Sequence, residues 1–111
     1  LVLDSTRVLS LQGQLSLLES AAAASLCETL VAADTGVLHM AEALGKNVIG
    51  LLGPSGFGGP ARATSRSIEV KLWCRPSTKD GRGTCVNRPF QRCMVEITPQ
   101  KVFDTIKEVT R

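Results

Sequence analysis

Hydrophobic and polar residues along the chain follow patterns that predict short strands separated by helices. The apolar runs at residues 8–11 and 30–33 are typical of short strands, and residues 68–72 alternate like a half-exposed edge strand. The run at residues 47–52 is continuous, as expected of a strand that is covered on both faces of a parallel sheet. We therefore predict that residues 47–52 form the central strand.

The first predicted helix begins after Ser16. Ser16 and Glu19 have the spacing of a capping box, in which the hydroxyl accepts from one backbone amide and the carboxylate from another. The alanines that follow favour a helix as far as Leu26. Leu18, Ala22 and Leu26 recur at four-residue intervals, so we expect this stripe to pack closely against a flat surface.

Two further helices are predicted downstream. Residues 37–44 are closed by Gly45, which is placed to end a helix, and the expected core face is Val37, Met40, Ala41 and Leu44. Thr98 and Pro99 are typical of the N-cap and first position of a helix. The apolar face of that last helix is expected to be Val102, Phe103, Ile106 and Val109. A helical turn is also predicted near residues 90–93.

Strands and helices that alternate in this way predict an α/β domain with a Rossmann-like, doubly wound parallel sheet joined by right-handed crossovers. The 111 residues suffice for one domain with a single core. In open α/β sheets, ligands bind beyond the carboxyl ends of the strands. The residues that follow the strands at 30–33, 47–52 and 68–72, the last being the start of the cysteine-bearing segment, are therefore the candidates for a site.

The sharpest candidate is the turn Asp34-Thr35-Gly36, because it precedes a helix whose free amides and dipole favour an anionic group such as a phosphate. His39 is four residues after Thr35, so both side chains should project from one face of that helix. The alternative is that Asp34 or Thr35 only caps the helix and that His39 is a solvated surface residue. Spacing alone leaves both interpretations open.

The loop at residues 53–60 has four glycines, and with Gly53 and Ser55 it is a second candidate for holding an anion through backbone amides. It matches neither the P-loop pattern nor the G-x-G-x-x-G dinucleotide fingerprint. A simple connection between strands is the alternative.

Composition narrows the class of protein. No apolar run is long enough to span a bilayer, and a net charge of +3 with few aromatic residues argues against a nucleic-acid partner. The four cysteines, in a chain with a substantial apolar core, are interpreted as reduced thiols of a cytoplasmic protein, and Cys27 as a core residue. The chain begins without Met or a signal peptide, so we expect an N-terminally truncated domain.

The order of residues between Val31 and Ser55 resembles the signature of glycosyltransferase family 9, the ADP-heptose:lipopolysaccharide heptosyltransferases. That signature is D-T-G-x-x-H-x-A-x-A-L-G, a hydrophobic strand and then G-P-[ST], and every fixed position is matched. The family's later segments are similar to Cys74-Arg75-Pro76, Cys85, Arg92-Cys93-Met94 and Ile97-Thr98-Pro99. Ser77 departs from the family, because many members have a second Cys there, and this argues against a metal or cluster role for the thiols.

This resemblance implies two facing Rossmann-like domains, the GT-B arrangement, of which residues 1–111 would be the partial C-terminal, donor-binding one. The implied donor is ADP-heptose or a related nucleotide sugar, and the implied acceptor is the lipopolysaccharide inner core, with no cofactor and no obligatory metal. The implied donor contacts are Asp34, Thr35, Gly36 and His39, with Gly53 and Ser55 lining the same cleft. The catalytic base is expected in the missing N-terminal domain, so the fragment alone should be inactive.

The segment from Cys74 to Cys93 admits alternatives. Its arginines and Lys79 make it basic, so it can face anionic lipopolysaccharide or the cytoplasmic face of the inner membrane, although a solvated loop is the preferred interpretation. Its thiols lack the C-x2-C pairs of structural zinc sites, which favours small buried thiols over zinc. Two rival functions remain: a non-catalytic nucleotide- or phosphate-binding module, and a small metal-binding interaction domain.

Overall fold

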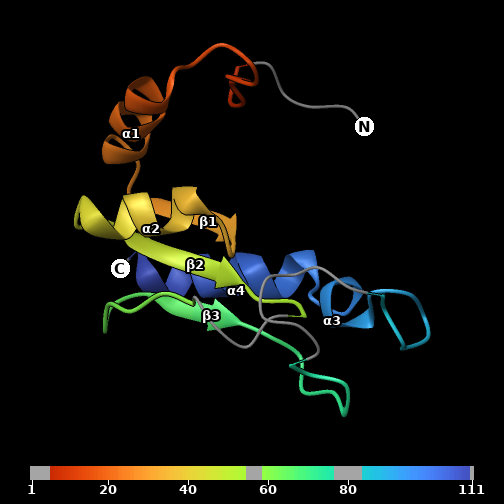
Figure 1. Cartoon of the computed structure of the whole chain (residues 1–111). Helices are drawn as coiled ribbons and strands as arrows, with labels where there is room; N and C mark the ends of the chain where they lie inside the picture. The colour runs from red at the N-terminus through yellow and green to blue at the C-terminus, as the bar shows by residue number, and fades with distance from the viewer. Residues whose placement is uncertain (1–5, 55–58, 77–83, 111) are drawn as a thin grey trace.

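A computed structural model describes residues 6–54, 59–76 and 84–110, and Figure 1 shows its elements in order along the chain. The helices and strands are α1 (Leu17–Ser25), β1 (Thr29–Ala33), α2 (Gly36–Ala43), β2 (Asn47–Leu51), β3 (Arg66–Ile68), α3 (Arg92–Val95) and α4 (Pro99–Val109). Most of the predicted elements are therefore present.

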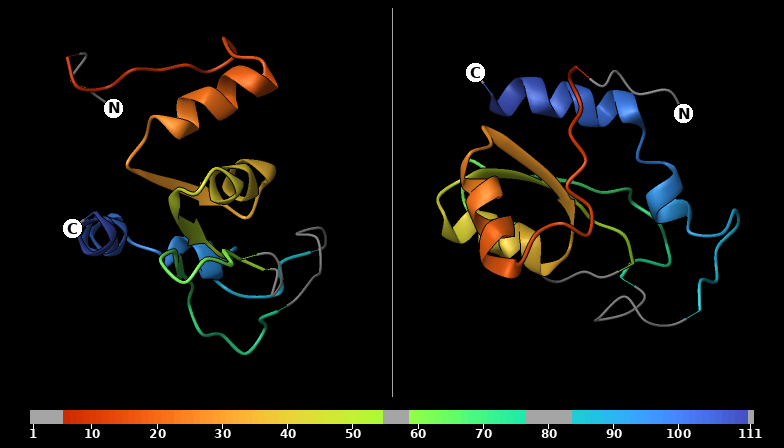
Figure 2. Two further views of the ribbon diagram at one scale, coloured as in Figure 1. Left: turned by 90° about the vertical axis from the view of Figure 1, so that its left-hand side faces the viewer. Right: turned by 90° about the horizontal axis from the view of Figure 1, so that it is seen from above.

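The sheet has the order β1-β2-β3, and both neighbouring pairs are parallel. α2 packs on β1 and β2, whereas α4 packs on β2 and β3 from the opposite face, as Figure 2 shows. α1 makes its main contacts with α2 and not with the sheet. A parallel sheet with helices on both faces confirms the predicted α/β class and its Rossmann-like layering.

The core lies between α2 and the sheet. Val48 and Ile49 of β2 are fully buried, which confirms the prediction that this strand is central and covered on both faces. Leu38 and Ala41 of α2 are also fully buried, and Ala24 of α1 packs against the same cluster.

The predicted helix ends are confirmed by specific hydrogen bonds. The Ser16 hydroxyl accepts from the Glu19 amide at 3.2 Å, and the Glu19 carboxylate accepts from the Ser16 amide at 2.9 Å, which completes the capping box. The Thr98 hydroxyl caps α4 by accepting from the Lys101 amide at 3.2 Å. Gly45 follows α2 with a φ of +80°, a conformation that favours glycine at the end of a helix.

The start of the chain differs from the prediction. Residues 8–11 form no strand, and Leu9 is 80% exposed. In α1, the predicted stripe is wrong as well, because Leu18 and Leu26 are more than four-fifths exposed, and Ala22 is exposed. The helix instead turns its alanine face inward: Ala24 has no bulky side chain, and this lets α1 approach α2. Cys27, expected in the core, is exposed just beyond this helix.

Details of α2, β3 and α4 also differ from the predictions. In α2, Leu38 is buried with Ala41, whereas Val37 and Leu44 are each 44% exposed, because the helix packs between α1 and the sheet along a neighbouring stripe. β3 ends at Ile68 instead of beginning there, since its pairing with β2 runs from Arg66 to Ile68. In α4, Phe103 is 55% exposed, and Thr105 occupies the buried position.

Candidate functional site

The carboxyl ends of the three strands lie together at one edge of the sheet. Ala33 pairs with Leu51, and Leu51 pairs with Ile68, so the three strands end in register. Asp34, Leu52 and Glu69 therefore leave the sheet side by side. This is the edge at which open α/β sheets bind their ligands.

The N-terminus of α2 opens at this edge. Thr35 is its N-cap residue in an extended conformation, and its side chain makes no capping hydrogen bond. Both Thr35 and Gly36 are exposed, and among the residues that the structure describes a Cβ atom built on Gly36 would meet nothing within 4 Å. The first amides of a helix have no partner one turn back, so this end can direct N–H groups and a positive dipole end toward a ligand, although the Leu38 amide already donates to the Thr35 carbonyl at 3.2 Å.

Asp34 and His39 are brought together across the first turn of α2. The Nε2 atom of His39 lies 3.4 Å from Oδ1 of Asp34, and the two side chains are 51% and 25% exposed. Thr35 and His39, whose spacing predicts that they share one face of the helix, are both exposed. The carboxylate can orient the imidazole, and both remain accessible to a ligand over the helix end.

Gly53 follows β2 and is buried between two neighbours. A Cβ atom at this position would lie 2.6 Å from Sδ of Met94, so α3 leaves no room for a side chain. From the other direction, Nε of Arg75 donates to the Gly53 carbonyl at 2.6 Å. Gly53 is thus held between Arg75 and Met94, two residues after the end of β2. The predicted site residue Ser55 lies outside the described residues.

Glu42, on α2, organises the chain that returns toward β3. Its carboxylate accepts hydrogen bonds from the amides of Ala61, at 2.8 and 3.1 Å, and of Arg62, at 2.8 Å. Burial is the largest influence on the Glu42 pKa and acts to raise it, but these amides, together with Ser65 and His39, outweigh burial and lower the pKa below 4.5.

The segment with the other three cysteines is only partly the solvated loop that was predicted. Arg75 is 10% exposed and bonded to backbone, and Arg92 pairs with Glu96 at 3.0 Å, so neither is a free surface charge. All four thiols are free; Cys93 is buried, whereas Cys74 and Cys85 are intermediate. Within the part of the chain that the structure describes, no group of three or more His, Cys, Asp or Glu side chains could hold a metal.

Sequence reasoning missed two residues that shape this site. Arg75 counted only as one of several basic residues of its segment, and no pattern singled out Glu42. Both bind backbone groups of segments distant in the sequence: Arg75 binds Gly53, and Glu42 binds Ala61 and Arg62. Side chain to backbone bonds of this kind have no sequence spacing, so no pattern signals them.

A parallel sheet with an open helix N-terminus beyond its strand ends is the arrangement of α/β proteins that bind phosphorylated ligands. A family model described as glycosyltransferase family 9 (heptosyltransferase) matches residues 2–88. The chain therefore belongs to glycosyltransferase family 9, and the family resemblance of the sequence is confirmed. No curated protein and no solved structure matched the chain. Among the described residues, no helix is long and apolar enough to cross a membrane.

Proposed function

We propose that this chain binds the diphosphate of a nucleotide-sugar donor, ADP-heptose, at the N-terminus of α2. Family membership supports glycosyl transfer, and the observation that carries the site is the exposed start of α2, where the Thr35 side chain makes no capping bond and no other described residue fills the space at Gly36. Free amides at a helix N-terminus bind phosphate oxygens well. The acceptor that we propose is a sugar hydroxyl of the lipopolysaccharide inner core.

The chemical contribution of this domain is stabilisation of the leaving diphosphate. When the bond between sugar and diphosphate breaks, negative charge grows on the diphosphate oxygens, and donors that are already in place at the end of α2 stabilise it without reorganisation. Asp34 and His39 lie at the same end, where the carboxylate can accept from a sugar hydroxyl and the imidazole can donate to an oxygen of the donor. Gly53 lines the next strand end.

The rest of the reaction belongs to the proposed partner domain. In the two-domain arrangement that we propose, the acceptor and the acidic catalytic base come from an N-terminal Rossmann-like domain that faces this edge of the sheet. The whole enzyme would work at the cytoplasmic face of the inner membrane, where the acceptor is anchored. On this proposal the isolated chain binds donor but transfers no sugar.

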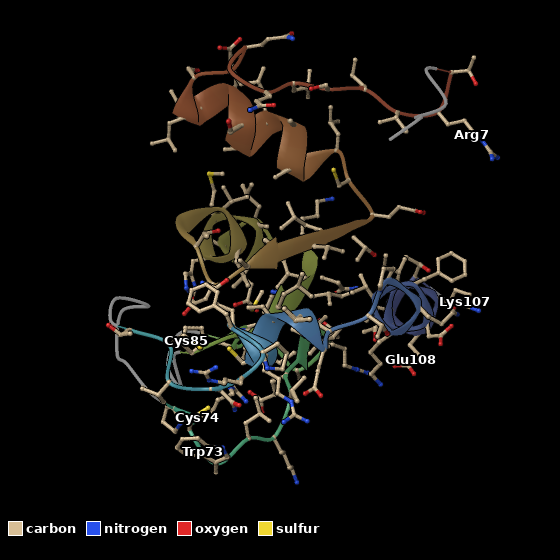
Figure 3. All side chains as sticks on the ribbon, turned by 90° about the vertical axis from the view of Figure 1, so that its right-hand side faces the viewer. Arg7, Trp73, Cys74, Cys85, Lys107 and Glu108 are labelled. Carbon is tan, nitrogen blue, oxygen red and sulfur yellow. The ribbon has the colours of Figure 1, made fainter. Side chains whose placement is uncertain are left out.

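The test is calorimetric titration of the chain with ADP-heptose and with ADP. Asp34→Ala and His39→Ala should each weaken donor binding about tenfold, the cost of one charge-assisted hydrogen bond. Glu108→Gln is the matched control, because it removes an exposed carboxylate on α4, where Figure 3 labels Glu108. Its affinity should equal that of the unmodified chain.

Two results would overturn parts of this proposal. Full donor affinity in both variants would show that the donor does not bind at the N-terminus of α2. Tight binding of ADP without discrimination in favour of ADP-heptose, together with no transfer when the partner domain is supplied, would favour a non-catalytic nucleotide-binding module.

A further inference from the structure

Arg75 carries a buried charge that the proposed reaction does not use. Its side chain is only 10% exposed, although it lies in the segment whose basic residues suggest a solvated loop. An arginine that is withdrawn from water needs several partners to offset the loss of hydration. The structure supplies three such partners.

The guanidinium joins the ends of two strands. Nε donates to the carbonyl of Gly53, after β2, at 2.6 Å, and Nη1 donates to the carbonyl of Val70, after β3, at 2.8 Å. Nη2 pairs with the Glu69 carboxylate at 3.2 Å. Because the guanidinium is planar and rigid, its bonds fix the direction of both carbonyl groups relative to each other.

Gly53 is also in close contact with α3. The position where its Cβ would be is within 2.6 Å of the Met94 sulfur, so α3 packs directly on the glycine. The hydrogen bond from Arg75 and the packing of α3 therefore fix the path of the backbone after β2, at the edge of the sheet where α2 begins. Each of the three guanidinium nitrogens makes one of these bonds, and the side chain is only 10% exposed, so Arg75 presents little surface to a diphosphate.

We propose that Arg75 is a positioning residue for donor binding: it fixes the Gly53 carbonyl and thereby the exit of β2 that lines the site. This inference rests on the proposed function, because it concerns affinity for the same diphosphate. A small displacement of a residue that lines a site is enough to lower binding or rate markedly.

The experiment compares Arg75→Lys with Glu69→Gln and Arg88→Gln in the same chain. Lysine keeps the charge near Glu69, but its single ammonium cannot reproduce the fork on two carbonyls. Calorimetry with ADP and with inorganic pyrophosphate is carried out at a temperature where circular dichroism shows every variant folded. Arg75→Lys should weaken both ligands at least about tenfold, in parallel, because the diphosphate part of the site has moved.

The two other variants are controls with different meanings. Glu69→Gln removes the ion pair but leaves both carbonyl bonds of Arg75, and exposed Arg88→Gln removes a charge of the same segment. Both should stay within about twofold of the unmodified affinity. If Arg75→Lys does not fold, Arg75→Gln serves instead, because its amide can donate to one of the two carbonyls.

The outcomes separate this inference from the proposed function. If a folded Arg75 variant binds ADP and pyrophosphate as tightly as the unmodified chain, while Asp34→Ala and His39→Ala still weaken donor binding, only the positioning role is wrong. A loss in Arg88→Gln as large as that in Arg75→Lys would show that binding does not depend on the bonds Arg75 makes to the two carbonyls, and would also overturn it. If the unmodified chain binds neither ligand, the proposed function fails and this inference fails with it.

Discussion

At the scale of single residues, two side chains connect the edge of the sheet to segments that lack regular structure. Arg75 joins the exits of β2 and β3, and Glu42 holds the backbone at Ala61 and Arg62 against α2. Hydrogen bonds from backbone amides to a carboxylate are stronger than those between neutral groups. The arrangement around the N-terminus of α2 therefore depends on residues that the family signature does not fix. Glu42 occupies a variable position of that signature, and Arg75 follows it in the chain.

The contribution of Glu42 should depend on pH. Its pKa is lowered in the folded chain, so the stabilisation from the ionised carboxylate is fully present above 4.5 and is lost as the pH falls through the lower, folded pKa. Glu42→Gln should reduce the free energy of unfolding by about 1 kcal/mol at neutral pH, since the carboxylate is only partly buried. Urea unfolding of both proteins between about pH 7 and about pH 3 should show this difference shrinking in acid.

The control for that experiment is Glu108→Gln, which removes an exposed carboxylate that has no part in the contact with Ala61 and Arg62. A stability difference for Glu42→Gln that stays constant down to the lowest pH would mean that ionisation of Glu42 does not stabilise the fold.

At the scale of elements, α1 and α2 differ in how they use their apolar residues. α2 buries Leu38 completely between α1 and the sheet, whereas α1 leaves Leu17 and Leu18 mostly exposed and contributes the small side chain of Ala24. Removing a buried leucine costs both its transfer free energy and a cavity. The same substitution should therefore cost much more stability in α2 than in α1.

Leu38→Ala should lower the free energy of unfolding by about 2–5 kcal/mol, whereas Leu18→Ala should change it by less than about 0.5 kcal/mol. The exposed leucine is the matched control for the buried one, since the same atoms are removed from a helix in each case. Denaturant titration measures both. A loss for Leu18→Ala as large as that for Leu38→Ala would mean that the stripe predicted on α1 is buried after all.

The elements whose ends carry a local chemical signal were predictable, and those defined only by partners were not. Ser16 with Glu19, Gly45, and Thr98 with Pro99 fix helix ends within a few residues of sequence, and all three ends are confirmed. Residues 8–11 have the apolar pattern of a strand but form none. A strand also needs a neighbouring strand to pair with, and the local sequence does not show whether such a neighbour is present. Glu42 and Arg75 were missed for the same reason.

The candidate site was predictable to the extent that it is local. Asp34, Thr35, Gly36 and His39 lie within one turn and one helix start, so spacing alone places them at one end of α2, and the structure brings Asp34 within 3.4 Å of His39. Gly53 comes from the next strand, and its place beside that helix end follows from the parallel order of β1 and β2. Their contact with a donor stays a prediction.

At the scale of the whole molecule, the chain is more open than a compact domain of its length. Its radius of gyration is 15.0 Å, compared with about 13 Å expected for a compact chain of this size. The N-terminal segment and α1 extend above the rest of the fold in Figure 1, and this is where many of the exposed leucines lie. A ligand that binds only the folded state stabilises that state by mass action, so ligand binding can be measured as a gain in stability.

Donor-like ligands should therefore raise the melting temperature of the chain in an order set by their phosphates. ADP at about one hundred times its dissociation constant should add about 2.7 kcal/mol to the free energy of unfolding. For a domain of this length, that corresponds to a rise of roughly 10 °C. Adenosine lacks the diphosphate that we place at the open amides of α2, so at equal concentration it should raise the melting temperature far less.

Asp34→Ala should reduce the shift caused by ADP-heptose. Differential scanning calorimetry gives all of these values, and a shift from adenosine equal to that from ADP would show that the base, and not the helix N-terminus, holds the nucleotide.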